Sequence, residues 1–257
     1  MPDRLDEGQR TLARDSGLLI LDSYRTAAQD EAVAGANYKG LKIHALPVIH
    51  EEAEKAAIRL FVPNGNVLDI ASGSGALCLR LHDRDFKLTG CDLVTENFRL
   101  HDKLPFVEVN LNLPFSEKFS QQYDGITATE IIEHVENPRH FLRECFALLK
   151  PGGTLVLTTP NVDSGFARAF LIRSGSFWWF DKVHYLRDGH ITPVPLFMLK
   201  SALQEAGFEQ PSVSSVGENE GPGLSWWRMH ALAWLLRRLD TNDMPQKEIL
   251  FVTARKP

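Results

Sequence analysis

Two aspartates and a pair of glycines have the types and spacing of a nucleoside-binding site. Asp69 ends the apolar run NVLDI, and Gly73-Ser74-Gly75 follows it, directly before the helix-like run GALCLRLHD. A glycine turn between a strand and a helix points backbone N–H groups at a ligand above the carboxyl end of the strand. Asp92 ends the next strand-like run about 20 residues further on, where a carboxylate can accept hydrogen bonds from both hydroxyls of a ribose. We therefore expect a nucleoside pocket; the alternative is a tight turn beside a solvated Asp92.

A second group of chemically active residues lies in the stretch EIIEHV. Glu133 and His134 follow Glu130 by three and four residues, so one helical turn would aim all three side chains the same way. Together with His190 of DGHITPV, they are candidate ligands for a divalent metal such as Mg²⁺, which would orient two substrate hydroxyls and lower the pKa of one. The alternatives are substrate contacts, a general base or a polar helix start. Between the two histidines of the aromatic stretch SFWWFDKVHYLRDGH, we prefer His190 to His184 as the base.

The elements that must position these residues follow a regular alternation. Apolar, β-branched runs predict strands at 66–70, 86–93, 106–110, 123–129 and 153–159. Helix-compatible runs lie between them, and Asn137 with Pro138 begins a helix that KPGG at 150–153 ends. Strands alternating with helices predict right-handed crossovers and a parallel sheet covered on both faces.

The flanking regions are expected to carry the acceptor specificity. Residues 1–63 form an N-terminal extension with an amphipathic helix at 50–61, and residues 64–257 form the main domain. Within that domain, 160–195 is the expected substrate lid and 217–245 a helical insertion between two C-terminal strands, which would pair as an antiparallel hairpin. The aromatics Phe177 to Phe180 would line an acceptor pocket or pack the lid. The insertion also carries Trp226, Trp227, Trp234, Arg237 and Arg238. Its aromatic, partly basic character fits core packing, a homodimer face or a peripheral membrane contact.

Composition limits the classes of protein and partner. The chain has 257 residues, a net charge of -5 and a pI near 6.0, so no general electrostatic attraction draws it to nucleic acid. Its three cysteines include no CxxC pair, which favours buried thiols and a reducing, cytoplasmic location. No apolar run is long enough to span a bilayer, and the first ten residues lack the layout of a signal peptide.

The motifs in series resemble the class I S-adenosylmethionine-dependent methyltransferases, near the ubiquinone-pathway O-methyltransferases. The similarity runs from about Val67 to Phe208 and covers VLDIASGSG, GCDL, VNLNLPF, the stretch from YDGITATE to TTPN, and ALQEAGF, in the family's order. Cys78 stands where a dinucleotide fingerprint has its third glycine, which argues against NAD. Ala71 and Asn110 depart from the family's usual glycine and acidic residue.

The resemblance implies a Rossmann-like, doubly wound, mostly parallel seven-stranded sheet, with S-adenosylmethionine as the methyl donor. It places Asp69 near the methionine end of the donor, Asp92 on the ribose, and Asn110 and Leu111 at the adenine, with Thr129 facing the sulfonium. The implied donor-binding set is Asp69, Ala71, Ser72, Gly73, Gly75, Asp92, Leu93, Asn110, Leu111 and Thr129. The candidate catalytic residues are His190, His134 and Glu130, and the candidate metal ligands are Glu130, Glu133, His134 and His190.

Three functions remain open from the sequence. The leading one is O-methylation of a small-molecule, lipid-linked or sugar acceptor. The second is a metal-dependent RNA ribose 2′-O-methyltransferase, since the pattern Glu-x-x-Glu-His with a distant histidine resembles the magnesium site of enzymes that methylate small-RNA 3′ ends. The third is a non-catalytic binding or scaffold protein that keeps the fold, to which the departure at Ala71 points.

Overall fold

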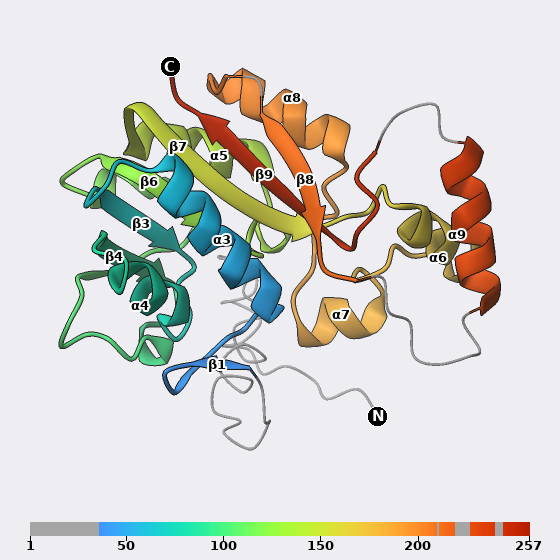
Figure 1. Cartoon of the computed structure of the whole chain (residues 1–257), viewed down its shortest axis with the longest axis horizontal. Helices are drawn as coiled ribbons and strands as arrows, with labels where there is room; N and C mark the ends of the chain where they lie inside the picture. The colour runs from blue at the N-terminus through green and yellow to red at the C-terminus, as the bar shows by residue number, and fades with distance from the viewer. Residues whose placement is uncertain (1–35, 210, 219–226, 240–243) are drawn as a thin grey trace, which may run out of the picture.

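A computed structural model describes residues 36–209, 211–218, 227–239 and 244–257. In these residues the main sheet has seven strands in the order β5-β4-β3-β6-β7-β9-β8 (Figure 1). The first five are parallel, and β9 runs antiparallel to both β7 and β8. The strands are β3 (Asn66–Ile70), β4 (Lys87–Asp92), β5 (Phe106–Glu108), β6 (Tyr123–Ala128), β7 (Leu149–Pro160), β8 (Ser212–Val216) and β9 (Ile249–Arg255). The expected doubly wound sheet with an antiparallel C-terminal hairpin is therefore confirmed.

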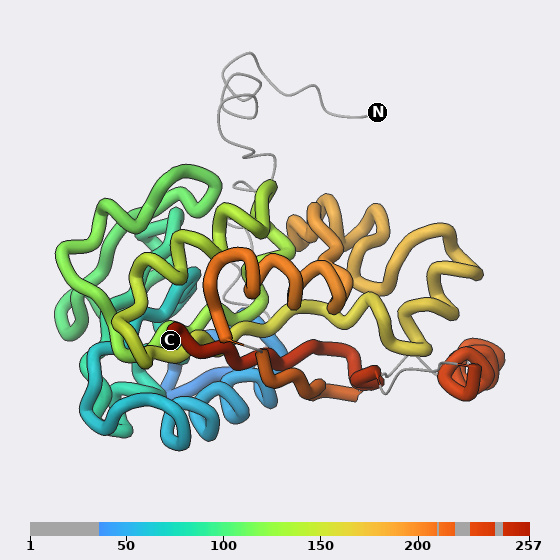
Figure 2. Tube along the Cα trace, turned by 90° about the horizontal axis from the view of Figure 1, so that it is seen from above, coloured from blue at the N-terminus to red at the C-terminus, as the bar shows by residue number. Residues whose placement is uncertain are grey.

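Helices cover both faces of the sheet, as Figure 2 shows. On one face lie α3 (Pro47–Leu60) and α4 (Ala76–His82), and on the other α5 (Pro138–Leu148) and α8 (Leu196–Ala206). Neighbouring strand residues divide between the two cores: Val67 packs toward α3 and α4, and Leu68 toward α5 and α8. This division is expected of a strand buried on both faces, where successive side chains point in opposite directions.

Two of the covering helices have the termini that their sequences predict. Asn137 accepts a hydrogen bond from the His140 N–H and precedes Pro138 at the first position of α5. Gly207 ends α8 in the left-handed conformation, with φ of 106°. On the opposite face, Glu54 of α3 forms ion pairs with Arg80 and Arg84, and these fix α3 against α4.

The remaining elements surround the carboxyl ends of the strands. A hairpin of β1 (Asn37–Tyr38) and β2 (Leu41–Lys42) precedes α3, and α6 (Gly165–Ser174) and α7 (Lys182–Arg187) follow β7. Helix α9 (Trp227–Leu239) packs on α6 at one end of the molecule. The first 35 residues of the expected N-terminal extension and Trp226 of the insertion lie outside the described residues.

The chain differs from the expectation in two places. The helix before KPGG ends as expected, at Leu148, but the strand begins earlier than expected: β7 starts at Leu149 and runs through KPGG, with Gly152 at φ of 80°. EIIEHV forms no α-helical turn: the 3-10 helix covers Ile132–His134 alone, and Glu130 lies before it at φ of 49°. This left-handed residue turns the chain, so Glu130 and Glu133 do not share a helical face.

Candidate active site

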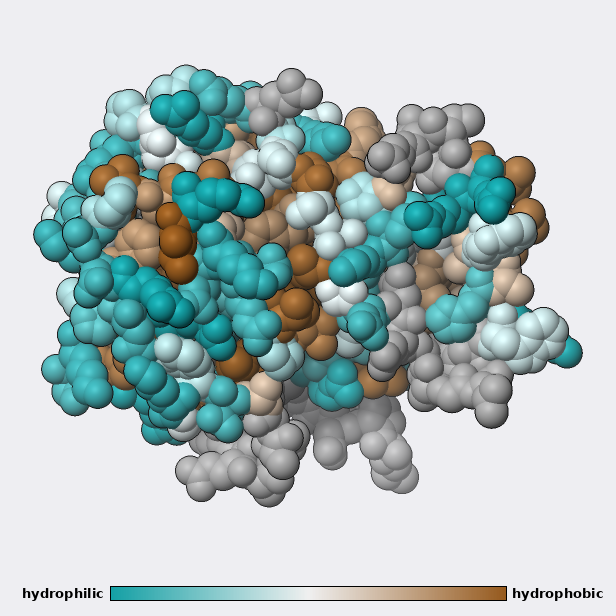
Figure 3. Space-filling view, viewed as in Figure 1, coloured by the Kyte–Doolittle hydropathy of each residue, from teal (hydrophilic) through white to brown (hydrophobic). Residues whose placement is uncertain are grey.

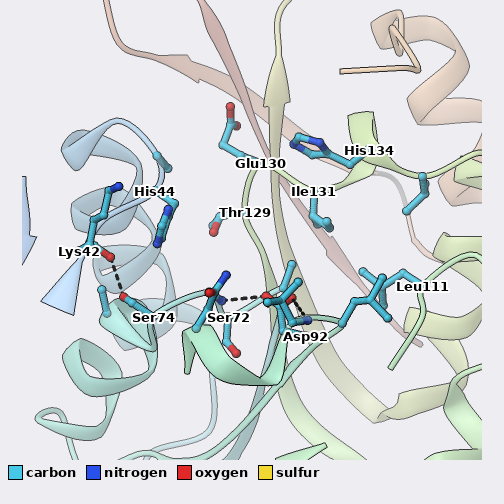
Figure 4. A pocket seen from close by; sticks show the side chains of 18 of the residues that line it. Lys42, His44, Ser72, Ser74, Asp92, Leu111, Thr129, Glu130, Ile131 and His134 are labelled. Atoms are coloured by element: carbon cyan, nitrogen blue, oxygen red, sulfur yellow. Dashed lines mark hydrogen bonds between the residues drawn. The ribbon is translucent and has the colours of Figure 1, made fainter. Parts of the chain in front are cut away.

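A pocket opens above the carboxyl ends of β3, β4 and β6 (Figure 4). The lining includes ten residues predicted from the sequence: Ala71, Ser72, Gly73, Asp92, Leu93, Asn110, Leu111, Thr129, Glu130 and His134. Asp69, Gly75, Glu133 and His190, which were also predicted, are not among the residues that line it. The carboxyl edge of the sheet thus brings most of the expected site together, and the other four residues lie behind its surface.

Asp92 holds the glycine loop in place beneath the pocket. Its two carboxylate oxygens accept the backbone N–H groups of Gly73 at 2.9 Å and Val94 at 3.0 Å. Asp92 is 9% exposed, and burial raises the pKa of its carboxyl, against the opposing effect of these N–H donors. The loop itself needs unusual backbone angles, with Ala71 at φ of 58° and Gly73 at 52°. Ala71 therefore adopts the conformation that the family's usual glycine favours, and the loop is preserved.

Asp69 and Gly75 support this floor from below. The Asp69 carboxylate accepts hydrogen bonds from the Thr127 hydroxyl at 2.7 Å and the Cys78 thiol at 3.2 Å. Burial raises the pKa of Asp69 to about 6. Gly75 lies in the left-handed conformation with φ of 87°, which favours glycine, and a Cβ there would also come within 2.9 Å of Leu100. The cysteine at the third-glycine position thus binds Asp69, and all three cysteines are buried and free, as expected.

The adenine end that the resemblance implies lies at the β4–β5 edge. Leu93 and Leu111 give this part of the pocket apolar walls. Asn110 is half-buried, and its side-chain oxygen accepts the Asn112 N–H at 3.0 Å. A carbonyl oxygen has two lone pairs, so Asn110 can still accept a hydrogen bond from an adenine amino group.

Glu130 faces the pocket from the end of β6. Its N–H donates to the Thr158 hydroxyl at 3.0 Å, and its carboxyl oxygen Oε1 is buried without a hydrogen-bond partner among the described residues. Burial, followed by the charge of Glu248, raises the pKa of Glu130 to about 7, although Thr158 opposes the shift. An acid–base group with its pKa near neutrality can accept a proton from a hydroxyl acceptor.

Glu133 and His134 connect the site to the segment that follows α7. The backbone oxygen of Glu133 accepts the N–H groups of Ile191 at 3.1 Å and Thr192 at 2.9 Å. The ring Nδ1 of His134 lies 3.0 Å from the Gly189 carbonyl, which can only accept, so Nδ1 carries the proton. Burial lowers the pKa of His134 to about 3. His134 therefore lines the pocket as a neutral imidazole.

His190 packs edge-to-face against His134 and does not line the pocket. The two ring centroids are 4.9 Å apart, and Nδ1 of His190 lies 2.8 Å from the Trp179 carbonyl. Glu133 is fully buried, with Oε2 accepting the Thr159 hydroxyl at 2.9 Å and Oε1 lying 3.7 Å from His134. Burial, followed by the charge of Glu130, raises its pKa well above the ordinary range.

Side-chain donor atoms of Glu133, His134 and His190 lie within 4.8 Å of one another, and this group does not include Glu130. Two imidazoles and one carboxylate suit a nitrogen-binding ion such as Zn²⁺ better than Mg²⁺, which prefers an octahedron of oxygens. The residues present therefore do not fit the expected magnesium ion. The contacts show a hydrogen-bonded connection between the segment after β6 and residues 189–192, which follow α7.

The N-terminal wall of the pocket was missed by sequence reasoning. Lys42, His44 and His50 line it, and a Cβ on Gly73 would lie 3.3 Å from the His44 ring. Burial lowers the pKa of His44, and it lowers that of His50 to about 4. The sequence signal that could have predicted this wall is the Lys39-Gly40 pair, which is typical of a tight hairpin turn. In the structure these residues have φ values of 50° and 87°, and the hairpin directs the chain over the glycine loop.

Comparisons with known proteins agree with this geometry. A family model described as a methyltransferase domain matches residues 46–213. The ubiquinone biosynthesis O-methyltransferase of Psychrobacter arcticus is 34% identical over 189 residues, which cover 69% of this chain and 69% of that protein. The protein of the same name from Xanthomonas campestris pv. campestris is 33% identical over 126 residues, 46% of this chain and 52% of that protein. The chain thus spans about half the length of the first curated relatives that it matches.

A solved structure shows the same fold. The crystal structure of a SAM-dependent methyltransferase from Archaeoglobus fulgidus superposes with a TM-score of 0.55 at 18% identity, covering 80% of this chain and 94% of that one. With the family match and the relatives, this places the chain: it belongs to the methyltransferase domain family, among the class I S-adenosylmethionine-dependent methyltransferases. The resemblance predicted from the sequence is confirmed.

Proposed function

We propose that the protein transfers a methyl group from S-adenosylmethionine to a hydroxyl oxygen of an apolar small molecule or a lipid-linked acceptor. One arrangement carries the proposal: Asp92 ties the glycine loop beneath a pocket whose lining also includes Glu130, a residue with a buried carboxyl group. The first feature suits a nucleoside donor and the second suits an acceptor that must lose a proton. The name of the two curated relatives, ubiquinone biosynthesis O-methyltransferase, supports oxygen as the methylated atom.

The donor side needs only to bind and orient. When a sulfonium transfers its methyl group, the electron pair of the broken C–S bond stays on sulfur. The leaving thioether is neutral, so the step needs no general acid. Asp92 and the loop would hold the nucleoside, with the apolar walls of Leu93 and Leu111 at the adenine. His44, packed against Gly73, would close the pocket on the opposite side and exclude water.

On the acceptor side, Glu130 would accept the hydroxyl proton. Glu130 lines the pocket, whereas His190, the base preferred from the sequence, lies behind His134. His134 can orient the acceptor through a hydrogen bond to its ring, but its lowered pKa makes it a weak base. Ile131 and Val135 border the same region, and their apolar surface suits an acceptor with little charge.

The two other functions have less support. The RNA hypothesis depended on a magnesium site, and the donor set that the fold assembles is poor in oxygen. The scaffold hypothesis depended on Ala71, and the loop around Ala71 keeps the shape and backbone contacts of a donor site. We therefore retain methyl transfer to oxygen.

Two measurements test the proposal. Calorimetry with S-adenosylhomocysteine should show one site per chain, and absence of binding would contradict the assignment of the donor pocket. Labelled S-adenosylmethionine is then supplied with a prenylated catechol in detergent, its soluble short-chain analogue, or total RNA, each with and without EDTA. We expect label in both catechols; chelator-sensitive label in RNA instead would overturn the acceptor class and restore the ribose hypothesis.

A further inference from the structure

Helix α9 has two apolar faces, and one of them is exposed. On the inner face, Met229 is 2% exposed and packs with Phe166 and Ala169 of α6. The outer face carries large side chains that are 47% to 69% exposed: Trp227, Trp234, Leu235 and Leu239. Apolar surface on an ordinary solvent-facing helix is confined to the stripe that meets the core. The second apolar face of α9 therefore needs an explanation.

The spacing of the two tryptophans makes them one surface. Trp227 and Trp234 are seven residues apart, which places them on the same stripe of a helix, about two turns from each other. Met229 and Leu236 have the same spacing on the opposite, inner stripe. Figure 3 shows hydrophobic and hydrophilic side chains alternating over α9 at the edge of the molecule.

The charged side chains within α6 and α9 are all basic. Helices α6 and α9 contain five arginines and no Asp or Glu: Arg168, Arg173, Arg228, Arg237 and Arg238. The whole chain has 28 Lys and Arg against 33 Asp and Glu, so without these five it has 23 basic and 33 acidic residues. A net negative protein thus carries three of these arginines on α9, the helix that exposes Trp227 and Trp234.

Arginine and tryptophan are presented together. The Arg228 guanidinium lies 5.3 Å from the centre of the Trp227 ring, and that of Arg238 lies 5.0 Å from the Trp234 ring. A shallow groove beside them is lined by Arg173, Trp227, Arg228, Met229 and Leu232. Tryptophan favours the boundary between lipid headgroups and acyl chains, and arginine pairs with phosphate in the same layer.

We propose that α9 and α6 form a docking surface for an anionic phospholipid bilayer, with α9 lying in the plane of the interface. A helix with exposed tryptophans and a cationic polar margin has the composition of an interfacial helix. A second copy of the chain is the less suitable occupant, because a symmetric contact would place cationic surfaces against each other with no acidic partner on either helix. Among the described residues no helix is long and apolar enough to cross a bilayer, so contact would be at the surface.

A series of aromatic contacts leads from this surface to the active site. Phe170 of α6 lies 5.0 Å from Trp178, and Trp178 lies 5.5 Å from Trp179, measured between ring centroids. The Trp179 carbonyl holds His190, which packs edge-to-face against His134 at the pocket. The docking surface therefore lies beside the lid, as an enzyme that takes its acceptor from a membrane requires. This link rests on the proposed function, whereas vesicle binding does not.

The test is flotation of the full chain with vesicles of phosphatidylcholine alone, or of equal parts phosphatidylcholine and phosphatidylglycerol. We expect binding to the mixed vesicles and little to the neutral ones. Trp227→Ser with Trp234→Ser should weaken binding at least about tenfold, because the anchoring rings are removed. Arg237→Gln with Arg238→Gln should weaken it about 25-fold, since each arginine near an anionic surface contributes about a fivefold factor.

The matched control removes the same charge elsewhere. Arg59→Gln with Arg143→Gln changes two exposed arginines outside α6 and α9 and should leave vesicle binding within about twofold. Equal loss in this control, or equal binding to neutral vesicles, would overturn the docking surface. So would a dimer in sedimentation velocity that Trp227→Ser with Trp234→Ser converts to a monomer. S-adenosylhomocysteine affinity, measured on every variant, separates failure of docking from failure of the donor site.

Discussion

The carboxylate of Asp92 has a structural task, and we propose that it has a binding task as well. It holds the Gly73 and Val94 N–H groups, and in the proposed donor site it would meet a ribose above them. A buried carboxylate that accepts several backbone hydrogen bonds defines the shape of the loop before any ligand arrives. Donor affinity should therefore depend on this group more than on any other single side chain of the loop.

We expect Asp92→Asn to weaken S-adenosylhomocysteine binding about 10- to 100-fold. The amide keeps one accepting oxygen but turns an NH₂ donor toward a backbone N–H, and each lost or unmade hydrogen bond costs about 1 to 2 kcal/mol. Titration calorimetry measures the change. Glu108→Gln, an exposed carboxylate on β5, is the control and should bind as the wild type does. Equal affinities in both variants would remove Asp92 from the donor site.

As the proposed base, Glu130 would link pH to both rate and stability. Its pKa is raised to about 7 by burial first and by Glu248 second, so the folded protein favours the protonated carboxyl. The sign for stability follows: between the unfolded pKa and about 7 the folded state holds the extra proton, and unfolding free energy falls as pH rises through this window. The sign for catalysis is opposite, because a base works in its deprotonated form.

Glu130→Gln should lower kcat about 100-fold or more, since a positioned general base contributes about 10² to 10⁴. The wild-type rate should fall as pH drops below about 7, and the remaining rate of the variant should not show that step. Unfolding free energy of the variant relative to wild type should rise between about pH 5 and about pH 8. Donor affinity is the control. A variant with a normal pH–rate profile would show that another group accepts the proton.

At the scale of elements, local sequence signals predicted most of the sheet and its helices. The run NVLDI became β3, Asn137 with Pro138 began α5, and Gly207 ended α8. These signals are local because caps, turns and apolar periodicity act within a few residues. The donor loop was predictable for the same reason: a strand, small residues and a helix follow one another directly along the chain.

The acceptor side was harder to predict because it depends on contacts between distant residues. Glu130 adopts a left-handed backbone angle that no residue type in EIIEHV requires, and this angle separates it from Glu133. His190 contacts His134 although it lies 56 positions later in the chain, after α7. His44 covers the glycine loop through the β1–β2 hairpin, which is too short to show a strand pattern. Tertiary context determined all three.

One close approach between elements can be tested directly. A Cβ on Gly125 of β6 would lie 2.5 Å from the ring of Phe61, which is 4% exposed after the end of α3. We expect Gly125→Ala to lower unfolding free energy by about 1 to 3 kcal/mol, the usual cost of overpacking. Urea denaturation measures it.

The control for this contact is a second substitution that makes room for the new methyl group. Phe61→Leu removes the ring atoms that the new methyl group would meet, so the double variant Gly125→Ala with Phe61→Leu should lose less than the sum of the single losses. Simple additivity would mean that the strand adjusts elsewhere and that the Phe61 ring does not set the limit.

At the scale of the whole molecule, the exposed tryptophans and arginines of α9 lie away from the proposed donor pocket. In the proposed function the methyl donor would enter the pocket above the carboxyl ends of the strands, while the exposed tryptophans and arginines lie on α9 at one end of the molecule. Such a separation suits an enzyme whose two substrates arrive from different phases, water and lipid. This separation also predicts that a condition acting on the α9 surface will change methylation of an acceptor held in a membrane and will not change methylation of a soluble acceptor.

Salt concentration is the condition that should distinguish the two acceptors most clearly. Raising it from about 0.1 M to about 1 M shortens the Debye length from about 10 Å to about 3 Å, which screens arginines at an anionic surface far more than groups inside a pocket. We expect the apparent KM for a prenylated catechol in phosphatidylglycerol vesicles to rise at least about tenfold, because fewer molecules are docked, with kcat at saturation unchanged. For the soluble short-chain analogue, KM should change less than about twofold. If salt affects both acceptors equally, it acts on the pocket itself, and delivery from a membrane is not how this methyltransferase meets its acceptor.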